Sequence, residues 1–295
     1  MIIKKLSELN QVANQAVIIN YNTKLVTTLA LLSAIKYAEM PVLLIDCEST
    51  DGSFEHFSTF METHDFDLIS APLKTHGDTL GWIFKHIPAD NVLAIDSDLE
   101  ILDSDIIKFF KKHISNPQVF GAGFINGPEW LNDPFFKKVG LKGALYHERP
   151  WMPIVLLKTS AVKRALELGF SFNAERIVNK FTLISRFKKP QHLLVRALMK
   201  LGPSWLRRPY HAYLKPSVVY HDTGSLIYQH LRYKEFQFFV SLPEPVHPEY
   251  VTHFFGTTRA NLHPEDENTG GGNDQIEEKV FELLKTKYNY EFEKV

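Results

Sequence analysis

The first hundred residues alternate short apolar runs with segments of helical periodicity, and this alternation constrains the fold more than any other feature. Four runs are strand-like, at 16–19, 42–45, 68–69 and 92–95. Between them, apolar residues recur three or four positions apart, as they do on one face of a helix. Strands that alternate with helices are typical of βαβ units. The sequence therefore predicts an α/β fold with a mostly parallel, Rossmann-like sheet flanked by helices.

Polar side chains follow three of these strand-like runs. The clusters lie at 20–22, 46–53 and 96–98. In open α/β sheets, ligands bind beyond the carboxyl ends of the strands. We therefore expect the three clusters to converge on one edge of the sheet and to form a site there.

The sequence Asp96-Ser97-Asp98 directly follows an apolar run. Two carboxylates this close at a strand end are unfavourable unless a positive charge lies between them. Mg²⁺ or Mn²⁺ would supply that charge, because both prefer hard oxygen ligands. The alternative is a loop that caps the next helix. On chemistry and placement, we interpret the two aspartates as a metal site that binds a diphosphate.

Three motifs in this order resemble a known family. They are the N-Y-N at 20–22, the D-x-x-S-T-D-G-S turn at 46–53 and the D-x-D at 96–98. Together they are similar to the GT-A-fold glycosyltransferases of the family-2 type. The resemblance is strong over 15–100 and continues through HDTGS at 221–225 and HFFGTTR at 253–259. The sequence departs from the family pattern at Cys47-Glu48. This difference affects the expected recognition of the nucleotide base and not the resemblance to this class of enzyme.

The resemblance implies that the strand-end residues bind a nucleotide-sugar donor. Asn20, Tyr21 and Asn22 would line the nucleotide pocket, and Asp46 or Asp51 would face the base. The alternative for Asn20 and Asn22 is a helix cap, because asparagine is a favoured capping residue.

The resemblance also implies a centre for Mn²⁺ or Mg²⁺. Asp98 would ligate the metal, and Asp96 would contact the metal or the ribose. His253 resembles the histidine that completes the coordination, with His221 as the alternative. An isolated histidine is more often a surface or core residue, and the chain has 13 of them. The residues that would hold diphosphate oxygens are Thr257, Thr258 and Arg259, for which an arginine fork is well shaped.

The remaining role is a general base. Enzymes of the resembled family mostly invert the anomeric carbon, which requires a carboxylate to accept the proton of the acceptor hydroxyl. Asp222 is the first candidate, because it follows a short apolar strand, and Glu175 is the alternative. Asp222 can instead be read as a cap of the predicted helix 225–231.

A basic segment interrupts an otherwise acidic chain. Residues 176–220 include ten lysines and arginines and no acidic residue, so the other 23 basic side chains stand against all 34 acidic ones. Within it, 191–201 has helical amphipathicity. This basic amphipathic segment, 176–215, is predicted to contact an anionic membrane surface, the alternative being a solvated face that packs on the sheet. The near-neutral total charge and the lack of a nucleic-acid motif argue against nucleic acid as a partner.

The chain is predicted to form one GT-A-like domain over 1–260, with a donor half at about 15–125, an acceptor half at about 126–260, and a C-terminal loop and helix at 261–295.

Its 295 residues suffice for a core without disulfides. The single cysteine, Cys47, fits a reducing compartment. Neither a membrane-spanning stretch nor a secretory signal is evident. A cytoplasmic protein, peripheral to the inner face of the membrane, is expected.

The resulting hypothesis is a metal-dependent glycosyltransferase in the synthesis of cell-surface glycans or polysaccharides. It would move a sugar from a nucleoside-diphosphate donor, with a UDP-sugar as the first choice, to a hydroxyl of a glycan or lipid-linked glycan. One alternative is a nucleotidyltransferase of sugar metabolism. Such an enzyme normally has a glycine-rich basic loop after the first strand, where this chain has Asn20-Tyr21-Asn22-Thr23. The other is a catalytically inactive sugar-nucleotide-binding protein.

Overall fold

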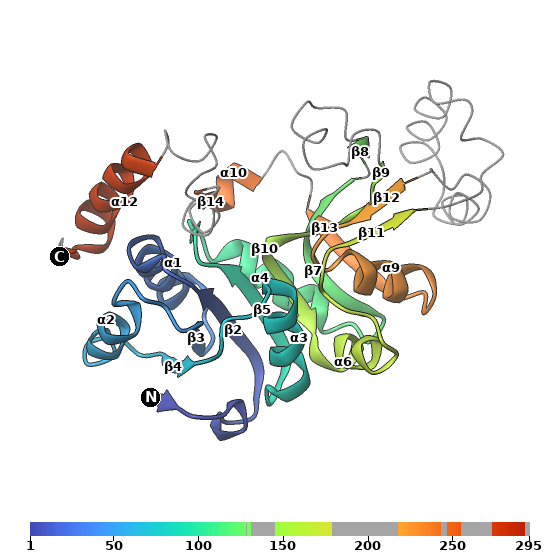
Figure 1. Cartoon of the computed structure of the whole chain (residues 1–295), viewed down its shortest axis with the longest axis horizontal. Helices are drawn as coiled ribbons and strands as arrows, with labels where there is room; N and C mark the ends of the chain where they lie inside the picture. Colours follow the sequence, from blue (N-terminus) through green and yellow to red (C-terminus); the bar gives the residue numbers. More distant parts are fainter. Residues whose placement is uncertain (128, 131–144, 179–217, 243–246, 255–272, 293–295) are drawn as a thin grey trace.

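The computed structural model describes residues 1–127, 129–130, 145–178, 218–242, 247–254 and 273–292 (Figure 1). Within them the central sheet has eight strands in the order β1-β4-β3-β2-β5-β10-β7-β13. The strands are β1 (Ile2–Ile3), β2 (Val12–Asn20), β3 (Val42–Asp46), β4 (Asp67–Ser70), β5 (Ala89–Asp96), β7 (Val119–Asn126), β10 (Arg149–Lys158) and β13 (Phe238–Leu242).

Helices cover both faces of this sheet, which confirms the predicted α/β fold. The described helices are α1 (Lys24–Tyr37), α2 (Ser53–Phe60), α3 (His76–His86), α4 (Asp105–Ile114), α6 (Thr159–Glu167), α9 (Ser225–Tyr233), the short α10 (His247–Tyr250) and α12 (Asn273–Tyr288), and the 3-10 turn η1 spans Leu6–Glu8. The four strands and three helices predicted over the first hundred residues are all present.

The first five strands of the order, from β1 to β5, are parallel to one another. The sheet then changes direction, because β10 runs antiparallel to both β5 and β7. The last strand, β13, is parallel to β7. The sheet is therefore mixed, with its parallel part built from the N-terminal third of the chain.

Two smaller sheets flank the central one. The first has the order β11-β12-β9-β8, built from β11 (Glu175–Val178), β12 (Val218–His221), β9 (Leu145–Tyr146) and β8 (Glu129–Trp130). The second is a two-stranded ladder of β6 (Leu99–Ile101) and β14 (Val251–His253). The predicted strand at 218–220 is therefore present as β12, in the part of the chain where the sequence signal is weaker.

The hydrophobic core has two halves, one on each face of the central sheet. Leu44 packs in the half that α1, α2, α4 and α12 cover, whereas its neighbours Leu43 and Ile45 pack in the half that α3, α6 and α9 cover. This alternation follows from the strand period of two. Because both faces are buried, the parallel strands are continuous apolar runs, which is the signal that made them predictable.

The C-terminal helix belongs to the core. Val280 and Leu284 of α12 are fully buried and pack in the same half of the core as α1, beside which α12 lies in Figure 1. The helix predicted within the C-terminal segment 261–295 is therefore present and begins at Asn273. Because the apolar face of α12 packs against α1, this packing holds the helix in place independently of any single polar contact.

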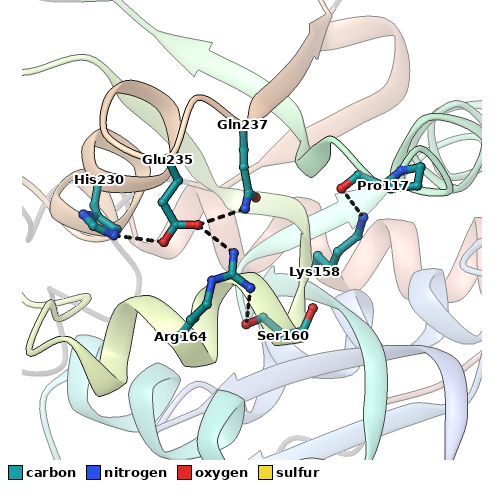
Figure 2. A network of polar contacts seen from close by, with 7 residues as sticks. All are labelled: Pro117, Lys158, Ser160, Arg164, His230, Glu235 and Gln237. Carbon is teal, nitrogen blue, oxygen red and sulfur yellow. Dashed lines mark hydrogen bonds and ion pairs between the residues drawn. The ribbon is translucent and has the colours of Figure 1, made fainter.

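A polar network joins α6, α9 and the entry to β13 (Figure 2). Arg164 donates to a carboxylate oxygen of Glu235 over 2.7 Å, and Gln237 donates to the same oxygen over 3.0 Å. The Nε2 atom of His230 lies 3.0 Å from the other oxygen. Burial alone would raise the pKa of Glu235, but Arg164 and His230 outweigh it and lower the pKa below its ordinary value. The ionised carboxylate thus connects three elements of the second half of the chain.

Two expectations concern residues outside the described ranges. They are the amphipathic helix at 191–201 and most of the basic segment 176–215. Among the described residues, no helix combines the length and apolar character needed to cross a bilayer.

Candidate metal centre and donor site

The three polar clusters converge as predicted. Strands β3, β2 and β5 are neighbours, and their registers pair Asn20 with Asp46 and Ile19 with Asp96. The carboxyl ends of the three strands therefore lie side by side at one edge of the sheet.

Asn20 and Asp46 are buried in the floor of this edge, at 0% and 1% exposure. The Asn20 amide donates to Asp46 over 2.7 Å and to the Ser49 hydroxyl over 3.1 Å. Its oxygen accepts from the hydroxyls of Thr23 and Thr27, each over 2.8 Å. In this structure both side chains hold the strand ends and the following loop together, and their expected contact with a donor stays a prediction.

Asp51 fixes the start of two helices. One carboxylate oxygen accepts from the backbone N–H of Lys24 at the start of α1, and the other accepts from that of Ser53 at the start of α2, each over 3.1 Å. Asn22 has a φ of +52° and accepts from the backbone N–H of Thr50 over 2.7 Å. The cap of α1 thus comes from the loop 47–53, while Asn22 binds that loop.

Tyr21 is half-buried and packs against the core half on the α3 side. Its place beside the strand end is the one expected of a pocket-lining residue, and that role stays a prediction.

Asp96, Asp98 and His253 form one group. Each offers a ligand atom, and these atoms all lie within 4.8 Å of one another. The His253 Nε2 atom is 2.9 Å from Asp98 and 3.8 Å from Asp96. The ladder of β6 and β14 causes this meeting, because it pairs His253 with Leu99, the residue after Asp98. The structure therefore brings together residues that are 155 positions apart in the sequence.

The electrostatics of this group fit a divalent cation. Burial raises the pKa of Asp96 above its ordinary value, and the charges of Asp98 and Asp222 raise it further, while His76 and His253 oppose them. Crowded carboxylates of this kind are stabilised when a positive charge lies between them. Two carboxylates and one imidazole are a suitable donor set for Mn²⁺.

His76 is a site residue that the sequence analysis missed. Its Nε2 atom lies 3.9 Å from Asp96, and its side chain is 42% exposed. It is the first residue of α3, which follows β4 at the same edge of the sheet. Reading the helix starts together with the strand ends would have included it.

The start of α3 is firmly held beside the metal group. Asn173 donates to Asp78 over 2.7 Å, and Thr75 donates to Asn173 over 2.8 Å. A Cβ atom at Gly77 would lie 2.4 Å from the Asn173 side-chain oxygen, so only glycine allows this close approach. The position of His76 is therefore set by the segment that follows α6.

The N-cap position of α9 is Gly224 and not Asp222. The helix itself begins at Ser225, and Gly224 before it has a φ of +79°. One Asp222 carboxylate oxygen instead lies 3.0 Å from the Nε atom of Arg149. Because the charge of Asp222 contributes to the raised pKa of Asp96, the candidate base and the metal group share one electrostatic environment.

The alternative residues, Glu175 and His221, lie on β11 and β12. Glu175 is exposed on β11 and pairs in register with His221. His221 is buried, stacks on His147 at 4.9 Å and lies 3.2 Å from the Ser225 hydroxyl. The group that could hold a metal ion, among the described residues, includes His253 and not His221. The expected diphosphate residues Thr257, Thr258 and Arg259 fall outside the described ranges.

No protein-family model and no curated protein matches the sequence. Solved structures do match. The mannosyltransferase PcManGT from Pyrobaculum calidifontis, in complex with GDP-Man and Mn²⁺, is 14% identical, with 92% of this chain and 74% of that one covered and a TM-score of 0.42. TarS from S. aureus in complex with UDP-GlcNAc is 13% identical, with 94% and 73% covered and a TM-score of 0.38.

The glycosyltransferase GlyE from Streptococcus pneumoniae is a third match, at 14% identity and a TM-score of 0.35, with 78% of this chain and 45% of that one covered. All three matches are at most 14% identical to this chain. Because their TM-scores are all below 0.5, these matches assign neither a role to any residue nor an activity to this chain. The fold is established by the strand order described above.

Proposed function

We propose that this chain is a metal-dependent glycosyltransferase that uses a nucleoside-diphosphate-sugar donor. The observation that carries the proposal is the meeting of Asp96 and Asp98 with His253 at the carboxyl edge of the parallel part of the sheet. Ligands bind at this edge in open α/β sheets, and the three side chains come from the motifs that resemble the family.

In this proposal Asp98 and His253 hold Mn²⁺ or Mg²⁺, and Asp96 contacts the metal or the ribose. When bound, the cation would neutralise the diphosphate as it leaves. Asp51 and the loop 47–53 would face the base, which is first taken to be uracil, and Thr257, Thr258 and Arg259 would hold diphosphate oxygens.

Transfer would proceed with inversion. The acceptor hydroxyl oxygen forms a bond to the anomeric carbon while the bond from that carbon to the diphosphate breaks, and the diphosphate keeps the electron pair. Asp222 would take the hydroxyl proton, since Arg149 at 3.0 Å orients its carboxylate. Glu175 is the second candidate for this role.

The acceptor is proposed to be a glycan or a lipid-linked glycan precursor, and the basic segment 176–215 is proposed to contact an anionic membrane. A nucleotidyltransferase is disfavoured, because the residues after β2 are Asn20-Tyr21-Asn22-Thr23 and not a glycine-rich basic loop. An inactive nucleotide-sugar-binding protein differs from the proposal only in turnover.

A thermal-shift screen of nucleotide sugars, with Mn²⁺ and with EDTA, tests the proposal. At a ligand concentration of about 100 times Kd, binding adds about 2.7 kcal/mol to stability, which should raise Tm by about 5 °C for a chain of this size. We expect such a shift with Mn²⁺ and little shift with EDTA. Equal shifts in both conditions would contradict the metal requirement.

The donor identified by the screen then distinguishes the enzyme from an inactive binder. We expect slow release of the nucleoside diphosphate when the donor is incubated with protein and Mn²⁺, because water can replace the acceptor. A protein that binds the donor but neither hydrolyses it nor transfers its sugar to any hydroxyl acceptor would be the inactive alternative.

A further inference from the structure

The geometry of the metal group depends on the short ladder of β6 and β14. Asp98 directly precedes β6, and His253 ends β14. Backbone hydrogen bonds close the ladder at both ends: the Phe254 N–H donates to the Asp98 carbonyl and the Leu102 N–H to the Tyr250 carbonyl, each over 2.8 Å. A shift of one strand against the other would therefore change the distance between the two candidate ligands.

A buried carboxylate lies in the middle of this ladder. Glu100 pairs in register with Thr252 and is 1% exposed. It is not part of the metal-ligating group found among the described residues. Since a buried carboxylate is strongly unfavourable without a partner, its position in β6 must be stabilised by other groups.

Both partners come from the C-terminal helix. One Glu100 oxygen accepts from the Lys287 ammonium over 2.6 Å and from the Tyr288 hydroxyl over 2.9 Å. Lys287 also lies over the rings of Tyr37 and Tyr288, at 5.9 and 5.6 Å. The last turn of α12 is thus connected to β6, two residues from Asp98.

We propose that Lys287 and Tyr288 are positioning residues for the metal group. They hold Glu100 inside β6, and β6 in turn aligns Asp98 with His253. This inference rests on the metal site of the proposed function. Without the ammonium group, the Glu100 carboxylate would move towards solvent, the ladder would shift, and the ligand atoms would no longer be held together.

The structure offers a matched control on the same helix. Lys285 is 73% exposed, and its ammonium lies 3.9 Å from Glu291. Because Val280 and Leu284 hold α12 in the core, replacing one terminal lysine should leave the helix in place. Lys287→Met and Lys285→Met therefore remove the same charge from the same helix and differ in the contact with Glu100.

The experiment measures the Mn²⁺ affinity of the full chain by electron paramagnetic resonance of the free ion. Loss of a residue that orients a metal ligand typically costs 10–100-fold in affinity, so we expect about a 10-fold loss for Lys287→Met. Lys285→Met should bind as the wild type does. The double variant Glu100→Gln/Lys287→Met should regain most of the affinity, because no buried charge is left without a partner.

Wild-type affinity in a folded Lys287→Met variant would overturn the inference, even if its unfolding temperature fell. If that variant does not fold, Tyr288→Phe decides, because it removes one hydrogen bond and should weaken binding about threefold. Unchanged binding in Tyr288→Phe would then overturn the inference. A wild type that binds no Mn²⁺ would instead refute the metal site itself, which is a distinguishable failure of the proposed function.

Discussion

Asp98→Asn is expected to weaken Mn²⁺ binding by about 100-fold or more, because losing a ligand should cost at least as much as losing a residue that orients one. Nucleotide binding should lose its dependence on Mn²⁺ in the same variant. The change keeps the size of the buried side chain and removes its charge from a group that includes Asp96 and His253. Titration calorimetry with Mn²⁺, and then with the nucleotide, measures both effects.

Asp90→Asn is the control for this prediction. Asp90 lies on the same strand, β5, but at its opposite end, and it is exposed. The control should bind Mn²⁺ and nucleotide as the wild type does. Equal affinities for the wild type and Asp98→Asn would show that the two aspartates do not form a metal site.

Asp222→Asn is expected to lower turnover by about 100-fold or more while the affinity for the donor stays nearly constant, as loss of a general base should. The amide keeps a contact partner for Arg149 but does not accept the proton of the acceptor hydroxyl. The measurement is kcat and donor KM for sugar transfer, or for donor hydrolysis with water as the acceptor.

Glu175→Gln is the matched comparison, because Glu175 is the alternative base and is exposed on β11. Near-normal turnover in that variant, with a large loss in Asp222→Asn, would support the proposed base. The reverse pattern would assign the base to Glu175.

The parallel half of the sheet was predictable because burial on both faces makes its strands continuous apolar runs. The exact start of β2 was not, since the residues from Val12 include Asn14 and Gln15, which break the run. Pairing with β5 carries the strand through these polar residues, for example where Asn14 lies opposite Asn91. The strand propensity of one segment does not reveal the hydrogen bonds that a neighbouring strand will provide.

Strand β7 was missed for a related reason. Its sequence includes Gly121 and Gly123, which weaken a strand signal. The structure shows why a glycine is needed, because a Cβ atom at Gly121 would lie 2.7 Å from Leu157 and 2.8 Å from Phe239. The close approach of β10 and β13 is a tertiary constraint, and in the sequence alone the glycine resembles a turn.

The meeting of the candidate metal ligands was predictable from motifs, whereas the residues around them were not. Asp96, Asp98 and His253 stand in recognisable sequence contexts, and the structure brings them together. His76 belongs to no motif and reaches Asp96 because of where α3 starts. The partner of Glu100 lies 187 positions away, and only the folded chain shows that the two meet.

The most direct test of the central claim is a crystal structure with Mn²⁺ and the nucleotide found in the screen, with data collected at the manganese absorption edge. The account predicts an anomalous peak between Asp98 and His253, at about 2.0–2.3 Å from a carboxylate oxygen and from the imidazole Nε2 atom. A peak elsewhere on the molecule, or a nucleotide bound at this edge with no metal at saturating Mn²⁺, would contradict it.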